Sequence, residues 1–151
     1  MRALALIPVL ALTACASDPM GTGGAPPMAQ NGNDCAVIAA VAKGHYQFGP
    51  SNEPPPLWLD AEGSGWAPRC DWGRYGVSFP RTYDPDARPA DPRRNAYVQF
   101  KRPRYDADGR VATIDAAIVH GPLAGMGVEC RVRSGVAGWS LDGQCRNSWI
   151  S

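Results

Sequence analysis

The clearest pattern in the chain is an alternation of apolar and polar residues over its last third. Residues 128–133 read Val-Glu-Cys-Arg-Val-Arg, and residues 112–118 carry an apolar side chain at every second position. A period of two is typical of strands with one buried face. Residues 96–101 and the segment that ends at Ser151 also have the composition of strands. Short connections join these four to five strands, which predicts an antiparallel meander.

Before this region, the pattern predicts a single helix. Asn33 or Asp34 can cap a short helix that runs to Ala42 or Lys43, and Gly44 is a natural stop. The apolar stripe of this helix would cover one face of the sheet. Its members are Val37, Ile38, Ala40 and Val41.

The segment between the helix and the meander has little regular pattern. Three prolines at 54–56 favour an extended backbone, and a short strand is expected at 57–59. Residues 66–79 are aromatic-rich and have no clear period, and residues 80–95 are expected to form a long exposed loop. The predicted fold class is α+β, a short N-terminal helix on an antiparallel meander with two disulfides. Its strand order resembles cystatin-like or nuclear-transport-factor-like rolls, by analogy alone.

The N-terminal residues predict export. Arg2 precedes an apolar run of ten residues, 3–12, which is too short for a membrane span of about 20 residues and fits a secretory signal. The next motif, Leu12-Thr13-Ala14-Cys15, resembles the lipobox of bacterial lipoproteins. This resemblance implies cleavage before Cys15 and acylation of its thiol, which would anchor the protein to a membrane. The alternative is an ordinary secretory signal with an incidental cysteine.

The predicted organisation follows from this cleavage. Residues 1–14 form the signal peptide, residues 15–33 form the lipidated cysteine and a Gly- and Pro-rich linker, and residues 34–151 form one globular domain. Ala16 stands after the cysteine where Asp would favour the inner membrane. The expected location is therefore the periplasmic face of the outer membrane of a Gram-negative bacterium.

Composition adds little to this picture except through charge. Cleavage leaves 151 − 14 = 137 residues, and the loss of Arg2 leaves 15 − 1 = 14 basic residues against 14 acidic ones. The side-chain charge of the mature chain is then zero, which disfavours a nucleic-acid partner and general attraction to anionic lipid.

The four cysteines after the lipobox predict two disulfides in an oxidising compartment. Three pairings are open, and we favour Cys35–Cys70 with Cys130–Cys145, because the second pair lies in one hairpin at positions whose side chains would point to the same side. A zinc site is the alternative. It is disfavoured because the chain has no C-x-x-C spacing and only two histidines. We expect no metal and no cofactor.

The C-terminal block at 100–151 resembles small proteobacterial lipoproteins and secreted proteins of unknown function. The resemblance rests on residues 102–109, on the Gly-rich segment 121–127, on Trp139 and on the terminal Trp149-Ile150-Ser151. It covers about a third of the chain. It implies no activity for this protein.

Catalytic chemistry has one weak candidate, His120. We expect it at the end of a strand, on the same face as Ile118, where a roll-shaped domain would have the mouth of a cavity. Tyr46 and Asp71 are candidate partners for it. The simpler interpretation is a histidine at the rim before a Gly-Pro turn. The chain shows no nucleophile, nucleotide or paired-carboxylate motif, so we expect no catalytic residues.

Binding has two candidate surfaces. Arg102 and Arg104 belong to the one local basic cluster, which could face an acidic partner or simply be a solvated strand edge. Leu123 and Met126 lie in the Gly-rich segment 121–127, whose glycines we interpret as turn-forming. The leading hypothesis is a non-catalytic module that binds an envelope protein, as an inhibitor or accessory factor. The alternatives are a small-ligand or enzymatic pocket near His120 and a structural envelope protein.

Overall fold

The computed structural model describes residues 30–87 and 95–151, with side chains from Asn33 onward. The predicted signal peptide, Cys15, most of the predicted linker and the middle of the loop at 80–95 lie outside these residues. Helix α1 (Gln30–Gly44) begins before the predicted cap and ends at the predicted Gly44. Within the described ranges, no helix is long and apolar enough to cross a membrane.

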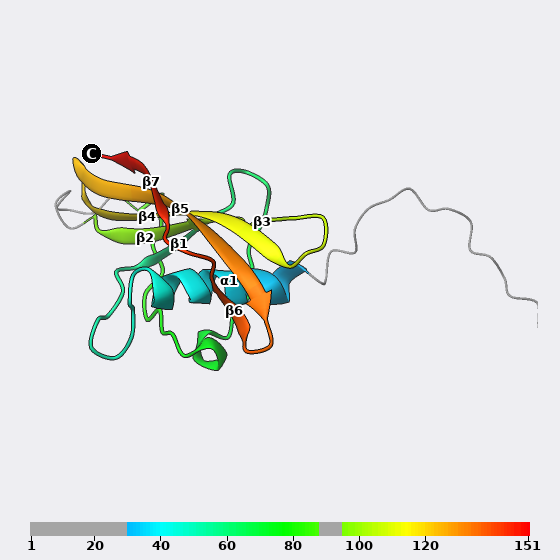
Figure 1. The fold of residues 1–151 in the computed structure, drawn as a ribbon. Helices are drawn as coiled ribbons and strands as arrows, with labels where there is room; N and C mark the ends of the chain where they lie inside the picture. The colour runs from blue at the N-terminus through cyan, green and yellow to red at the C-terminus, as the bar shows by residue number, and fades with distance from the viewer. Residues whose placement is uncertain (1–29, 88–94) are drawn as a thin grey trace, which may run out of the picture.

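Seven strands form one sheet beside this helix, which confirms the α+β class (Figure 1). The strand order is β1-β2-β4-β5-β6, with β3 beside β4 and β7 beside β5. The strands are β1 (Leu57–Asp60), β2 (Tyr97–Lys101), β3 (Arg104–Tyr105), β4 (Val111–Gly121), β5 (Ala124–Gly135), β6 (Gly138–Leu141) and β7 (Arg146–Ile150).

The predicted antiparallel meander of four to five strands is wrong in two respects. Strand β1 is parallel to β2, because the long connection between them lets the chain cross over before it pairs. In addition, two short strands, β2 and β3, pair with β4, and two others, β6 and β7, pair with β5. Pro103 has no N–H to donate and separates β2 from β3, whereas β6 and β7 pair with different parts of β5.

The core lies between the sheet and the loops of the segment at 45–87 that precede and follow β1, with α1 inside it. The helix is buried on nearly every side between residues 37 and 42, not along one stripe. The loop covers the side of α1 that faces away from the sheet and adds Phe48, Trp66 and Val77 to the core. Figure 1 shows this layering, with the loop and the short 3-10 helix η1 (Trp72–Tyr75) below α1 and most of the sheet above it, while the hairpin of β5 and β6 passes across α1.

A buried carboxylate ties three of these segments together near the start of α1. Asp34 accepts a hydrogen bond from Trp66 Nε1 at 2.8 Å and one from the Tyr105 hydroxyl at 2.6 Å. Burial and the bond to Asp34 raise the pKa of Tyr105 well above its ordinary value, so the phenol stays protonated and keeps donating. Helix, loop and β3 are thereby joined through one side chain.

Both predicted disulfides are confirmed. Cys35–Cys70 joins α1 to the covering loop, and Cys130–Cys145 joins β5 to the segment between β6 and β7. Two disulfides in so small a domain indicate an oxidising compartment.

Candidate binding face

The side of the sheet that faces away from α1, here called the outer face, carries an ordered set of side chains. Residues paired across neighbouring strands point to the same side of a sheet. One line of such pairs crosses five strands, and it has a tryptophan at each end and small or polar residues between. Its members are Trp58, Gln99, Ala117, Gly127 and Trp149.

Trp149 lies flat on β5, over two glycines. A Cβ built on Gly127 would lie 2.0 Å from Trp149 Nε1, and one built on Gly125 would lie 2.9 Å from its six-membered ring. Real side chains cannot approach so closely, so these positions must be glycine for the indole to lie there. The indole therefore runs along β5, and the residue remains 43% exposed. The turn-forming role predicted for these two glycines is wrong, because the turn itself takes up only Pro122 and Leu123.

Substitution of Gly127 by alanine is expected to displace the Trp149 indole from its position over β5. The added methyl group meets Trp149 Nε1 directly, and we expect a loss of about 1–3 kcal/mol in the free energy of unfolding. Acrylamide quenching should also show a more exposed tryptophan. Gly121→Ala is the matched control, because nothing lies within 4 Å of its Cβ position. Equal effects of the two substitutions would show that the position of the Trp149 indole does not depend on the glycine at position 127.

The next line across the outer face is charged and mixes acidic with basic residues. It contains Asp60, Lys101, Asp115, Glu129 and Arg146, and the strand registers pair Asp60 with Lys101, Asp115 with Glu129, and Glu129 with Arg146. Side-chain ion pairs also neutralise several of these charges. Lys101 Nζ lies 2.5 Å from Glu62, and Arg146 pairs with Glu129. The hydrogen bond that Lys101 donates to Glu62 raises the pKa of Lys101, so this ammonium stays charged.

The predicted basic cluster is therefore not a free cationic patch. Arg104 lies 2.7 Å from Asp115 and 3.5 Å from Glu129, and the bond to Asp115 raises the pKa of its guanidinium. Arg102 and Arg104 together line a polar hollow of about 570 Å³ near Tyr105. Arg104 and Lys101 already form ion pairs with acidic residues of this protein. The structure therefore gives little support to the hypothesis that they attract an acidic partner.

A smaller hollow lies in the middle of the outer face, between β2 and β7. Its volume is about 280 Å³. Gln99 and Lys101 form one side and Ser148 and Trp149 the other, with Ala117 and the backbone of β4 as the floor and Asp115 at one end. Gln99 Nε2 donates to Asp60 at 2.6 Å, which fixes the orientation of its amide.

Three of the four large apolar side chains that are exposed among the described residues gather at one end of the sheet, here called the distal end. They are Leu123, 87% exposed on the turn between β4 and β5, Ile150, 72% exposed, and Trp149. Met126 is half-buried and pairs in register with Ile150. The distal end is far from the point where the chain enters α1, as the position of the C-terminus in Figure 1 shows.

The structure thus separates the predicted binding residues into two places. Arg104 pairs with Thr113, and Gly121, just before Leu123, lies eight residues further along β4. At about 3.3 Å per residue, this is a separation of about 26 Å. Ile150 and Trp149 were missed as partners of Leu123 because their position depends on the pairing of β7 with β5.

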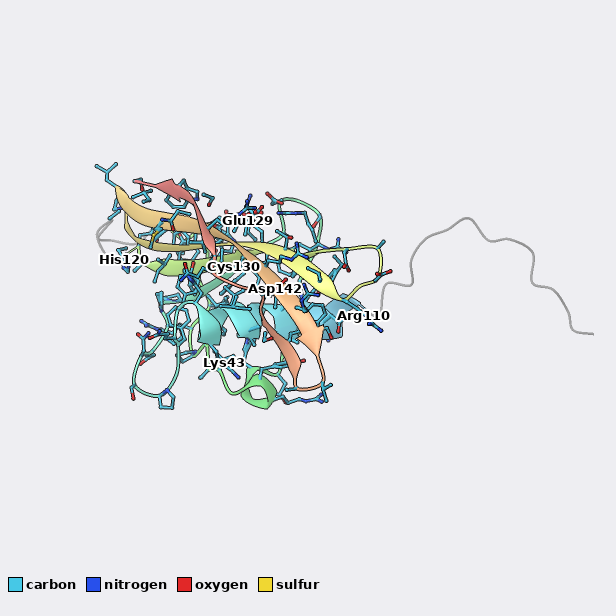
Figure 2. The ribbon with its side chains drawn as sticks, viewed as in Figure 1. Lys43, Arg110, His120, Glu129, Cys130 and Asp142 are labelled. Atoms are coloured by element: carbon cyan, nitrogen blue, oxygen red, sulfur yellow. A yellow bond between two sulfur atoms is a disulfide. The ribbon has the colours of Figure 1, made fainter. Side chains whose placement is uncertain are left out.

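His120 does not acquire the surroundings that catalysis needs. It is exposed near the end of β4, outside the hollows described above (Figure 2). Its candidate partner Tyr46 is half-buried on the helix side of the sheet, stacked on Phe48, and Asp71 occupies the N-cap position of η1. Burial raises the pKa of Tyr46, and its hydroxyl has no hydrogen-bond partner among the described residues. The structure brings none of these groups to His120.

Among the described residues, no three His, Cys, Asp or Glu side chains are grouped so that they could hold a metal ion. Comparison of the chain with protein-family models, with curated proteins and with solved structures found no match. The function of this protein is therefore inferred from the surface of the molecule itself.

Proposed function

We propose that this protein is a non-catalytic binding module of the bacterial envelope, anchored to a membrane through an acylated Cys15, whose distal end docks on a partner protein. The observation that carries the proposal is the gathering of Leu123, Ile150 and Trp149 at one end of the sheet. Scattered exposed apolar residues are ordinary in soluble proteins, whereas a cluster of them marks an interaction surface.

The arrangement of the chain supports this choice of surface. The lipobox would place the membrane on the N-terminal side of Gln30, where the chain enters α1, and the distal end lies away from that point. A docking surface turned away from the anchor is accessible to a partner in the periplasm. The two disulfides agree with an oxidising, exported compartment such as the periplasm.

The edge of β7 gives the partner a second means of attachment. This strand pairs with β5 on one side, all five of its residues are exposed, and among the described residues it has no strand on the other side. An extended segment of a partner can add to such an edge through backbone hydrogen bonds. Ile150 and Trp149 would then contact the added segment on opposite faces of the sheet.

Site-specific photocrosslinking in the native envelope tests the docking surface. A photoreactive amino acid at position 123 or 150 of the full-length protein should give one dominant adduct, and mass spectrometry identifies the partner. Position 136 is the matched control, because Val136 is equally exposed and apolar but lies on the turn between β5 and β6. The same adducts at all three positions, or none at 123 and 150, would contradict the proposal.

The anchor is tested separately by metabolic labelling with a fatty acid. The full-length protein should incorporate the label and the Cys15→Ser variant should not. Equal labelling of both proteins, or of neither, would reject acylation at Cys15 while leaving the crosslinking result to stand on its own.

A further inference from the structure

We infer that the hollow between Gln99 and Trp149 on the outer face binds one ring of a neutral saccharide. Its volume of about 280 Å³ lies at the lower end of the range for small-molecule sites, which suits a single sugar ring and not a large cofactor. Trp149 belongs to both this hollow and the distal end, but the inference concerns the hollow beside its indole and does not rest on the proposed protein partner.

The hollow combines an apolar wall with a polar rim, which is the combination that a sugar ring requires. A pyranose has C–H groups on its faces and hydroxyl groups around its edge. The indole of Trp149 supplies a rigid apolar surface, because the backbone of Gly125 and Gly127 supports it from below. Ala117 leaves the floor open where a larger side chain would fill it.

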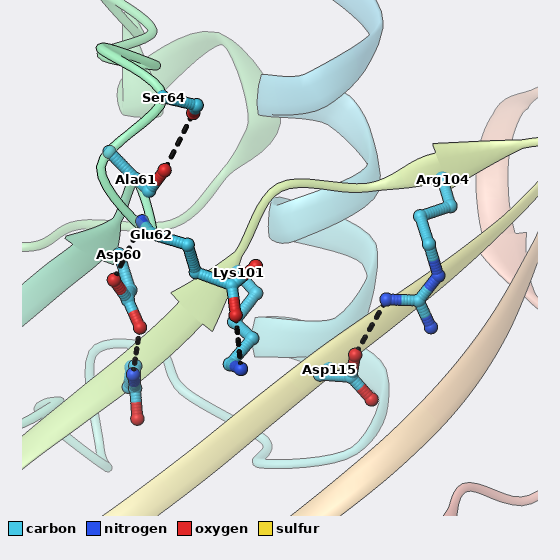
Figure 3. Close-up of polar contacts among 8 residues, drawn as sticks. Asp60, Ala61, Glu62, Ser64, Lys101, Arg104 and Asp115 are labelled. Carbon is cyan, nitrogen blue, oxygen red and sulfur yellow. Dashed lines mark hydrogen bonds and ion pairs between the residues drawn. The ribbon is translucent and has the colours of Figure 1, made fainter.

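The polar rim is held in place before any ligand arrives. Each of its three strongest polar groups is fixed by a partner: Gln99 by Asp60, Lys101 by Glu62 and Asp115 by Arg104. Figure 3 shows the last two pairs, with Glu62 on the turn after β1 and Lys101, Arg104 and Asp115 on β2, β3 and β4. Side chains fixed in this way lose little conformational entropy on binding, which favours even a weak ligand.

The charges of the rim select a neutral ligand. Lys101 and Asp115 have opposite signs, and their partners Glu62 and Arg104 reverse them, so the four charges cancel. An anion would be attracted by Lys101 and repelled by Asp115, and a cation would meet the reverse. Hydroxyl groups both donate and accept, so they can use the ammonium, the carboxylate and the Gln99 amide together.

Saturation-transfer NMR on the full-length protein in phospholipid vesicles tests this site. The probes are glucose, N-acetylglucosamine, cellobiose and N,N′-diacetylchitobiose, with glucuronate as the anionic comparison. At least one neutral probe should show saturable transfer to its ring protons, with a Kd of about 1 mM. We expect Trp149→Ala and Gln99→Ala each to weaken binding about tenfold or more, and Trp149→Phe to retain part of it.

Leu123→Ser is the control that separates this site from the protein-docking surface. It should leave saccharide binding unchanged while it weakens the crosslink at the distal end. The inference is overturned if no neutral probe shows saturable transfer, if glucuronate binds more tightly than the neutral sugars, or if Gln99→Ala and Trp149→Ala both bind as the unsubstituted protein does.

Discussion

Removal of the Cys35–Cys70 disulfide, by alanine substitution of both residues, is expected to lower the free energy of unfolding by about 4 kcal/mol. The two cysteines are 35 residues apart, against 15 for Cys130–Cys145, for which we expect about 3 kcal/mol. A longer closed loop restricts the unfolded chain more strongly. Denaturant unfolding of the two double variants, extrapolated to water, measures both values.

The first disulfide also has a local role that the second lacks. It fastens the loop segment at 45–87 to α1, and this segment contributes Trp66 and Val77 to the core. Without the disulfide, the loop keeps two hydrogen bonds to α1. One runs from the Trp66 indole to Asp34, and the other, of 2.7 Å, runs from Lys43 Nζ to the Tyr75 carbonyl. Hydrogen exchange should therefore accelerate in the loop before it accelerates in β4 and β5.

Two outcomes would contradict this account. A larger loss for the Cys130–Cys145 pair would show that packing around the fully buried Cys130, not chain entropy, dominates. Uniform acceleration of exchange across the loop and the sheet would show that the loop does not open as a separate unit.

The parts of the fold that the sequence predicted correctly are those with a local signal. The two-residue period at 112–118 and 128–132 identifies the buried faces of β4 and β5, because alternation depends only on the strand itself. The pairing of Cys130 with Cys145 was also accessible, because the two cysteines lie just beyond the open end of the hairpin formed by β5 and β6. The end of helix α1 was recognisable from Gly44, whereas its start at Gln30 lies before Asn33 and Asp34, the predicted caps.

The parts that could not be predicted depend on register between distant segments. The parallel pairing of β1 with β2 depends on the path of a long connection, which carries no periodic signal. Gly125 and Gly127 look the same in sequence whether they form a turn or support an indole. The difference lies in the pairing of β7 with β5, including the register shift next to Gly127.

The candidate binding surfaces show the same division. Leu123 could be singled out because an apolar residue in a Gly-Pro turn is exposed whatever the turn packs against. The pairing of Arg104 with Asp115 and Glu129 required the alignment of three strands. A count of local arginines could not show that these charges are already matched.

Substitution of Phe100 by alanine is expected to lower the free energy of unfolding by about 3–5 kcal/mol. Phe100 is fully buried in the middle of β2, and its ring lies 6.2 Å from that of Tyr46 and 6.3 Å from that of Phe79, both edge-on. Its removal leaves a cavity where sheet, helix and loop meet, and the rigid disulfide-linked loop limits how far the core can close around it. Thermal and denaturant unfolding measure the loss.

The adjacent residue provides the matched control, because it points to the opposite face of the same strand. Gln99→Ala removes an amide from the outer face and should change the free energy of unfolding by about 0.5 kcal/mol or less. The same variant is expected to lose saccharide binding, since Gln99 lines the hollow beside Trp149. Two consecutive positions would thus separate stability from recognition. A destabilisation by Gln99→Ala comparable to that by Phe100→Ala would instead assign the outer face a structural role and remove the reason to regard it as a binding surface.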